Sequence, residues 1–153
     1  MLTSFVPNTH PLLVHFPIAL LATAAILDVA RMALGRSSSV PTVTGLYMAG
    51  TMFLVVTYFS GRQAADTVHI TGMAHGTIVE HWTLAAWCVG YFVTLTVARL
   101  VMRSKLYRPQ RSINTGFVLA GLFGLVLLMT TADRGGQLVY RYGVGVVKTS
   151  DSP

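Results

Sequence analysis

The chain has 153 residues, of which 53% are hydrophobic and only 10% are charged. Soluble domains carry about 25% charged residues, so this composition excludes an ordinary soluble domain and favours a membrane protein. The formal net charge of +6 is spread over the segments between apolar runs. It forms no stripe of the kind that binds nucleic acid, and we expect no nucleic-acid partner.

Four apolar runs are long enough to cross a bilayer, which takes about 20 residues of helix. The sequence therefore predicts an all-α protein, a single four-helix transmembrane bundle over residues 1–153. We expect spans at about 11–34, 43–65, 76–102 and 113–132, followed by a surface segment over 133–153. The N-terminus lacks the basic stretch and cleavage site of a signal peptide, so we expect the first run to be retained as a span.

Basic residues predict the orientation of the bundle. Seven Lys and Arg residues lie at the ends and in the loops that follow the first and third spans, against four on the opposite side. Lys and Arg prefer the cytoplasmic side of a membrane. We therefore expect a multi-pass protein of the bacterial inner membrane with both termini on the periplasmic side. The seven residues are Arg31, Arg36, Arg99, Arg103, Lys105, Arg108 and Arg111.

The first span begins between two histidines, His10 and His15. Pro17 lacks an N–H group, so it leaves the carbonyl of Leu13 without its helical partner and predicts a bend beside His15. At the other end of this span, Asp28 and Arg31 are spaced to pair on one helical face. We interpret that pair as structural.

The second span ends in a polar segment that contains Arg62 and Asp66. The two are four residues apart, a spacing typical of an ion pair on a helical surface. Arg62 could instead contact an anionic group such as a haem propionate, because guanidinium groups bind carboxylates through two parallel hydrogen bonds.

Three further histidines, His69, His75 and His81, lead into the third span, so all five lie on the predicted periplasmic side. With a rise of 1.5 Å per residue, His15 lies about 6 Å and His81 about 9 Å inside their helices. A level pair of neutral imidazoles can supply both axial ligands of a b-type haem. We therefore predict His15 and His81 as the metal ligands, with His10 and His75 nearer the interface.

Two other interpretations of these histidines stay open. Imidazoles near a helix end also hydrogen-bond to backbone carbonyls or lie among lipid headgroups, without any cofactor. The segment from His69 through Met73 to His75 combines imidazole with thioether, which suits copper. Glu80 precedes His81, and it could bond to a histidine on a neighbouring helix or extend toward water.

The fourth span is rich in small residues, with Gly116, Ala120 and Gly124 spaced four apart. Such spacing allows another helix to approach closely. Gly135 and Gly136 follow this span, and two adjacent glycines predict a sharp turn there. The single cysteine, Cys88, lies within the third span and is expected to be a small apolar core residue.

Three segments carry a resemblance to a known family. They are HPLLVHFPIAL at residues 10–20, the stretch from Ser60–Gly61 to Ala64–Ala65, and GGQLVYRYGVGV at residues 135–146. Together they resemble small four-span bacterial membrane proteins grouped as domain of unknown function 2231. The resemblance implies a four-helix bundle in the inner membrane, association with redox proteins, and haem binding. Members commonly have a histidine where Tyr142 stands, so a ligand role is not carried over to this position.

These observations favour a small electron-transfer subunit that binds one b-type haem near the periplasmic face. It would belong to a larger redox complex of membrane subunits and exchange electrons with quinone. The alternative is a cofactor-free structural or assembly subunit that contacts neighbouring helices and lipid. A transporter or metal-handling protein is a third possibility. No catalytic constellation is apparent, so the sequence favours a non-catalytic or electron-transfer role over a stand-alone enzyme.

Overall fold

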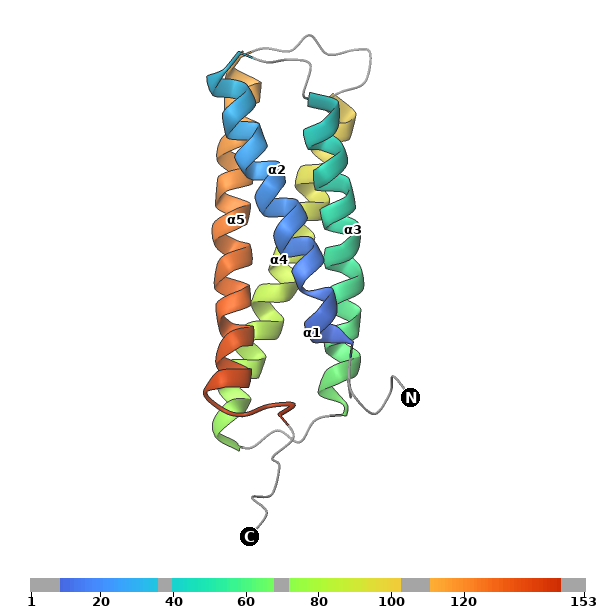
Figure 1. The fold of residues 1–153 in the computed structure, drawn as a ribbon, viewed down its shortest axis with the longest axis vertical. Helices are drawn as coiled ribbons and strands as arrows, with labels where there is room; N and C mark the ends of the chain where they lie inside the picture. Colours follow the sequence, from blue (N-terminus) through green and yellow to red (C-terminus); the bar gives the residue numbers. More distant parts are fainter. Residues whose placement is uncertain (1–8, 36–39, 68–71, 103–110, 147–153) are drawn as a thin grey trace.

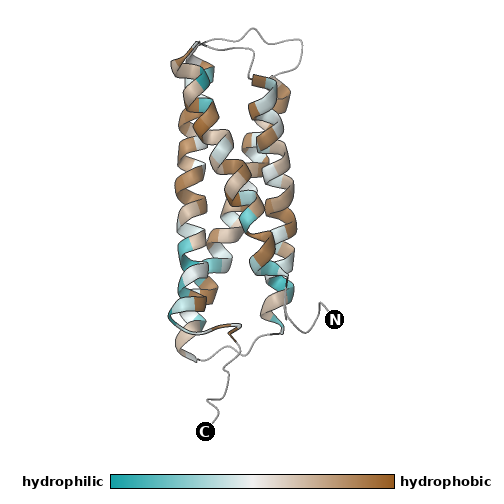
Figure 2. Cartoon of the chain, viewed as in Figure 1, coloured by the Kyte–Doolittle hydropathy of each residue, from teal (hydrophilic) through white to brown (hydrophobic). Residues whose placement is uncertain are grey.

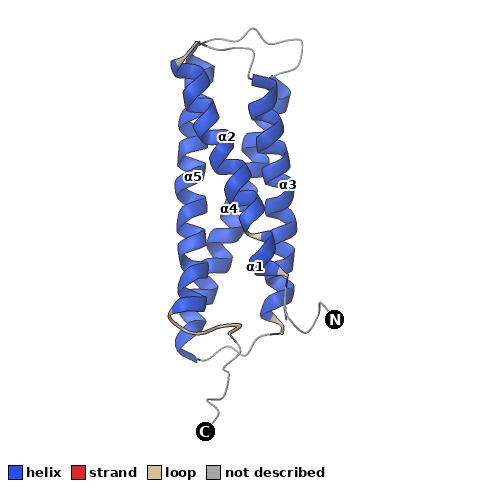
Figure 3. Ribbon diagram, viewed as in Figure 1, coloured by secondary structure: helices blue, strands red, loops and turns tan. Residues whose placement is uncertain are grey.

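The computed structural model describes residues 9–35, 40–67, 72–102 and 111–146, with the side chains of 111 and 112 left aside. Within these ranges the chain forms helices and no strand (Figures 1 and 3). The elements are α1 (His10–Leu13), α2 (His15–Ala33), α3 (Val40–Ala65), the short 3-10 helix η3 (Gly72–Ala74), α4 (His75–Met102) and α5 (Arg111–Tyr140).

Four helical stretches are long and apolar enough to cross a membrane, which confirms the all-α, four-span prediction. They are His10–Ala33, Val40–Ala65, Gly72–Met102 and Ile113–Tyr140. The hydrophilic colours in Figure 2 gather toward the two ends of these helices. One end of the bundle carries the described histidines, and we call it the histidine end. The other, where α2 and α4 finish, we call the arginine end. The side of the membrane on which each end lies stays a prediction.

The first span is interrupted at Val14, which separates α1 from α2. The cause is Pro17, whose ring nitrogen cannot donate to the carbonyl of Leu13. The Thr57 hydroxyl on α3 donates to that carbonyl instead, over 3.3 Å. The expected bend is therefore present, and a neighbouring helix satisfies the exposed acceptor.

The expected turn at Gly135 and Gly136 is wrong, because α5 continues through both residues to Tyr140. The predicted end of this span near residue 132 came from hydropathy, which falls where Asp133 and Arg134 enter the helix. The turn comes later, where Gly143 and Gly145 have positive φ angles of 66° and 77°. Such angles favour glycine because it has no Cβ.

The two helical hairpins, α2–α3 and α4–α5, are built alike. A Cβ atom at Gly50 on α3 would lie 2.7 Å from the side chain of Leu21 on α2. A Cβ atom at Gly124 on α5 would lie 2.8 Å from the Phe92 ring on α4. Leu21 and Phe92 are 71 positions apart, the same spacing that separates Asp28 from Arg99. In each hairpin, a large side chain on the first helix therefore packs against a glycine on the second helix, at equivalent positions.

The two hairpins also pack against each other in an equivalent way, since α2 contacts α5 as α4 contacts α3. In both hairpins the first helix runs from the histidine end to the arginine end, and the second returns (Figure 1). This is a parallel internal repeat, whose pseudo-two-fold axis runs along the bundle and hence along the membrane normal. Residues on the four inner faces form one core around this axis: Leu21, Ala24, Val43, Tyr47, Leu54, Cys88, Phe92, Leu95 and Leu128.

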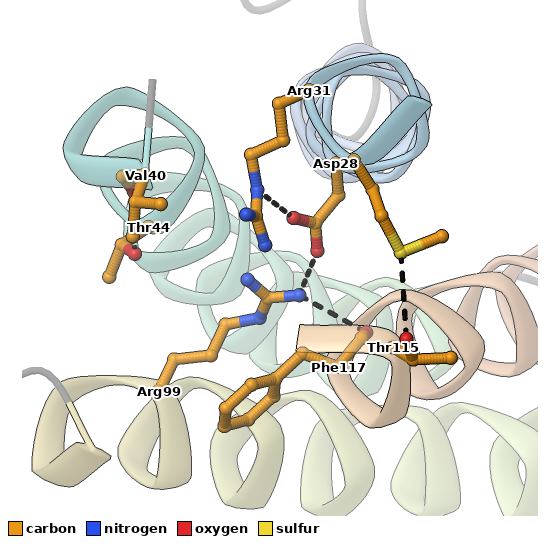
Figure 4. A network of polar contacts seen from close by, with 8 residues as sticks. Asp28, Arg31, Val40, Thr44, Arg99, Thr115 and Phe117 are labelled. Atoms are coloured by element: carbon orange, nitrogen blue, oxygen red, sulfur yellow. Dashed lines mark hydrogen bonds and ion pairs between the residues drawn. The ribbon is translucent and has the colours of Figure 1, made fainter. Parts of the chain in front are cut away.

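A buried ion cluster joins the four spans at the arginine end (Figure 4). Asp28, which has no exposed surface, accepts from Arg31 Nε at 2.6 Å and from Nη2 of Arg99. Arg99 Nη2 also donates to the carbonyl of Phe117 at 3.1 Å. Its guanidinium lies 4.2 Å from the ring centroid of Tyr47. The predicted pairing of Asp28 with Arg31 is confirmed, and Arg99 is a partner that the sequence analysis did not identify.

This cluster predicts a large loss of stability in Asp28→Asn, because two buried arginines would lose the carboxylate that they share. Breaking a buried pair from one side costs about 3–5 kcal/mol. We expect the free energy of unfolding in mixed micelles to fall by about 3 kcal/mol. Glu80→Gln is the control, since Glu80 and its partner Arg134 are 58% and 38% exposed. An equal effect of the two substitutions would show that the Asp28 cluster does not hold the bundle together.

Candidate functional site

A cavity of about 540 Å³ opens at the histidine end of the bundle. Residues from α1, α2, α3, α4 and α5 line it, so it lies where the two hairpins meet. Most of its lining is apolar, with imidazole, hydroxyl and guanidinium groups from His10, His81, Thr57 and Arg62 among it. Its volume falls within the range of about 300–1,000 Å³ that small-molecule and cofactor pockets occupy.

His10 at the start of α1 is held by the end of α3. Its Nδ1 lies 3.1 Å from the carbonyl oxygen of Thr57 and 3.0 Å from the hydroxyl of Ser60. Ser60 donates its own proton to that same carbonyl at 2.8 Å, so its oxygen is free to accept from the imidazole. The ring packs against Gly61, where a Cβ atom would come within 2.8 Å of Cε1.

His81 on α4 is held by α5 in the same manner. Its Nδ1 lies 3.0 Å from the carbonyl oxygen of Thr131, and a Cβ at Gly135 would lie 3.1 Å from its Cε1. His10 and His81 are 71 positions apart, the spacing that relates the first helices of the two hairpins. The two histidines therefore occupy equivalent positions of the internal repeat, and both line the cavity.

These contacts fix the protonation of both neutral rings. A carbonyl oxygen only accepts hydrogen bonds, so Nδ1 carries the proton and Nε2 keeps its lone pair. Within the described part of the chain, neither Nε2 of His10 nor that of His81 takes part in a hydrogen bond. Both rings line the same cavity. The cavity is thus lined by two oriented imidazoles, and in each the unprotonated Nε2 has a lone pair available to bind a metal ion.

The other predicted histidines lie elsewhere. His15 borders the cavity, but its side chain is exposed. It follows His10 by five residues, which turns it about 140° around the helix at 3.6 residues per turn. His10, the residue expected nearer the interface, is thus the histidine at the position equivalent to His81 in the repeat.

The segment proposed for copper is only partly described. His75 is exposed and does not line the cavity, and Met73 is 82% exposed. His69 lies outside the described residues. Among the residues with described positions, no three His, Cys, Asp or Glu side chains gather as a metal-ion site.

Arg62 lines the cavity near the end of α3, and its guanidinium lies 4.8 Å from the ring centroid of Trp82. The expected pair with Asp66 is not among the ion pairs of the described residues. Among the described residues, Glu80 does not bond to a histidine either. It pairs with Arg134 of α5 at 3.3 Å, in an exposed position.

The residues that hold the imidazoles were not among those predicted from the sequence. Thr57 and Gly61 on α3 correspond to Thr131 and Gly135 on α5, each in the order Thr-x-x-x-Gly-x-Gln. This short pattern, repeated in the second and fourth spans, is the feature of the sequence that could have indicated two similar hairpins, each holding a histidine.

The family comparison agrees with this architecture. A family model described as "Predicted membrane protein (DUF2231)" matches residues 7–148. The chain belongs to this family. The resemblance seen in the three sequence segments is thereby confirmed, and the family description names a membrane protein without a reaction. No curated protein and no solved structure matches the chain.

The glycine contacts predict that Gly61→Ala and Gly135→Ala each destabilise the protein. The added methyl group would displace an imidazole whose Nδ1 is hydrogen-bonded to a backbone carbonyl, that of Thr57 for His10 and that of Thr131 for His81. We expect a loss of about 1 kcal/mol in the free energy of unfolding in micelles.

Gly45→Ala on α3 and Gly116→Ala on α5 are matched controls, because within the described part of the chain no side chain or neighbouring helix lies within 4 Å of a Cβ at either position. Alanine is the better helix former by about 0.8–1 kcal/mol, so these variants should be unchanged or slightly more stable. If all four variants behave alike, the imidazoles do not depend on close packing against glycine.

Proposed function

We propose that this DUF2231 protein binds a b-type haem between His10 and His81 and transfers electrons within the membrane. The observation that carries the proposal is the symmetric pair of imidazoles, each with Nδ1 bonded to a carbonyl and Nε2 available to one shared cavity. The ligand pair differs from the expected His15 and His81 because His10, not His15, occupies the position equivalent to His81.

The residues present fit such a group. A porphyrin supplies four nitrogen ligands, so the protein needs to provide only the axial ones, and neutral imidazole is a common axial ligand of haem iron. Metal-binding histidines usually donate their second ring N–H to a carbonyl or carboxylate, which fixes ring orientation and raises ligand basicity. Thr57 and Thr131 provide this support through their carbonyl oxygens.

The surroundings of the site favour an electron carrier. When bound, the haem would supply a one-electron redox couple, and the apolar lining would hold it away from bulk water. The cavity lies toward one end of the spans, within reach of a redox partner at that surface. We propose that the partner is another subunit of a larger inner-membrane complex, and that quinone in the bilayer exchanges electrons with it.

The absorption spectrum of the purified protein, reconstituted with haem, tests the proposal. Wild type should show a Soret band and α band of a six-coordinate b-type haem. His10→Ala and His81→Ala should each abolish the six-coordinate spectrum, because either change removes one axial nitrogen. His15→Ala and His75→Ala should retain it. Wild-type protein without these bands, or bands indifferent to His10 and His81, would refute haem ligation.

A cofactor-free structural subunit is the second candidate, since both imidazoles already link adjacent helices through carbonyl oxygens. His81→Asn separates the two functions. The asparagine amide keeps a donor for the carbonyl of Thr131 but offers no imidazole nitrogen to iron. A structural role predicts a stable variant that still assembles with its partners. Haem ligation predicts a stable variant that has lost the spectrum.

A further inference from the structure

Arg62 breaks the symmetry of the cavity. In the internal repeat its equivalent on α5 is Gly136, which has no side chain. Both residues line the cavity, so a guanidinium group stands on one side only. The two imidazoles are thus related by the pseudo-two-fold axis, whereas the positive charge of Arg62 has no counterpart at Gly136.

Arg62 is also placed differently from three of the other described arginines. Arg31 and Arg99 share Asp28, and Arg134 pairs with Glu80. For Arg62 the described residues provide the face of Trp82 and no carboxylate. An aromatic face holds the guanidinium plane while its edge N–H groups remain free to donate. Those groups suit a carboxylate, which they bind through two parallel hydrogen bonds.

We propose that Arg62 anchors a carboxylate of the ligand that His10 and His81 bind. The ligand class is then a flat, mostly apolar ring system with an acidic side chain, as haem is through its propionates. This inference rests on the proposed function. It adds that the ligand is held in one orientation, with its acidic edge toward Arg62, although the two imidazoles are equivalent.

Titration of the apo-protein in detergent with haem and with haem dimethyl ester tests the inference. The ester keeps the ring and the iron but has no carboxylates. Wild type should bind haem about tenfold more tightly than the ester, since a hydrogen-bonded charge pair contributes roughly that factor. Arg62→Gln should lose this preference and bind the ester as wild type does, which also shows that its cavity is intact.

Arg141→Gln is the matched control. Arg141 also lies at the histidine end with its guanidinium over an aromatic ring, 5.7 Å from the centroid of Tyr142, but it does not line the cavity. It should keep the preference of wild type. A preference that survives in Arg62→Gln, or a wild type that binds both ligands equally well, would overturn the anchoring role and leave haem ligation standing. If wild type binds neither, the proposed function fails and the anchor with it.

Discussion

The bundle depends on close packing between a side chain of one helix and a glycine of the next. Leu21 lies against Gly50, and Phe92 lies against Gly124 at the equivalent place in the second hairpin. In a bilayer, apolar surface alone does not drive helices together, because lipid tails are as apolar as leucine. Tight packing at small residues therefore sets how closely the helices approach. The same kind of contact places the His10 ring against Gly61. The position of this imidazole therefore depends on how closely the two helices of its hairpin pack.

The two ends of the bundle have different physical roles. At the arginine end, one carboxylate is shared by two buried arginines, and their hydrogen bonds cross from α2 to α4 and α5. Removing Asp28 would leave both buried guanidinium groups without their carboxylate partner, so the packing of this end depends on that one residue. At the histidine end the first span is broken at Val14, and the helices enclose a cavity beside a small hydrophobic cluster of Ala74, Ile78 and Leu138. The buried ion cluster and the cavity therefore lie at opposite ends of the bundle.

Hydropathy and local spacing were enough to predict the spans and the pair between Asp28 and Arg31, because those features depend on neighbours in sequence. The partner Arg99 is 71 positions from Asp28, and no local pattern connects them. The choice between His10 and His15 depends on a similar long-range relation. Depth along the helix places His15 level with His81, but it is His10 that lies 71 positions before His81, at the equivalent position of the internal repeat. The proton positions depend on carbonyls of α3 and α5, which only the folded chain provides.

The internal repeat has a consequence for how the site and the fold are linked. Each hairpin contributes one imidazole with its carbonyl and glycine, so neither hairpin alone contains both nitrogen donors. A ligand bound to both rings would join the hairpins across the axis at the end where the buried ion cluster is absent. Because a ligand that binds only the folded state stabilises it by mass action, occupation of the cavity would add to the stability of the bundle. The repeat therefore makes assembly of the two halves and completion of the site the same event.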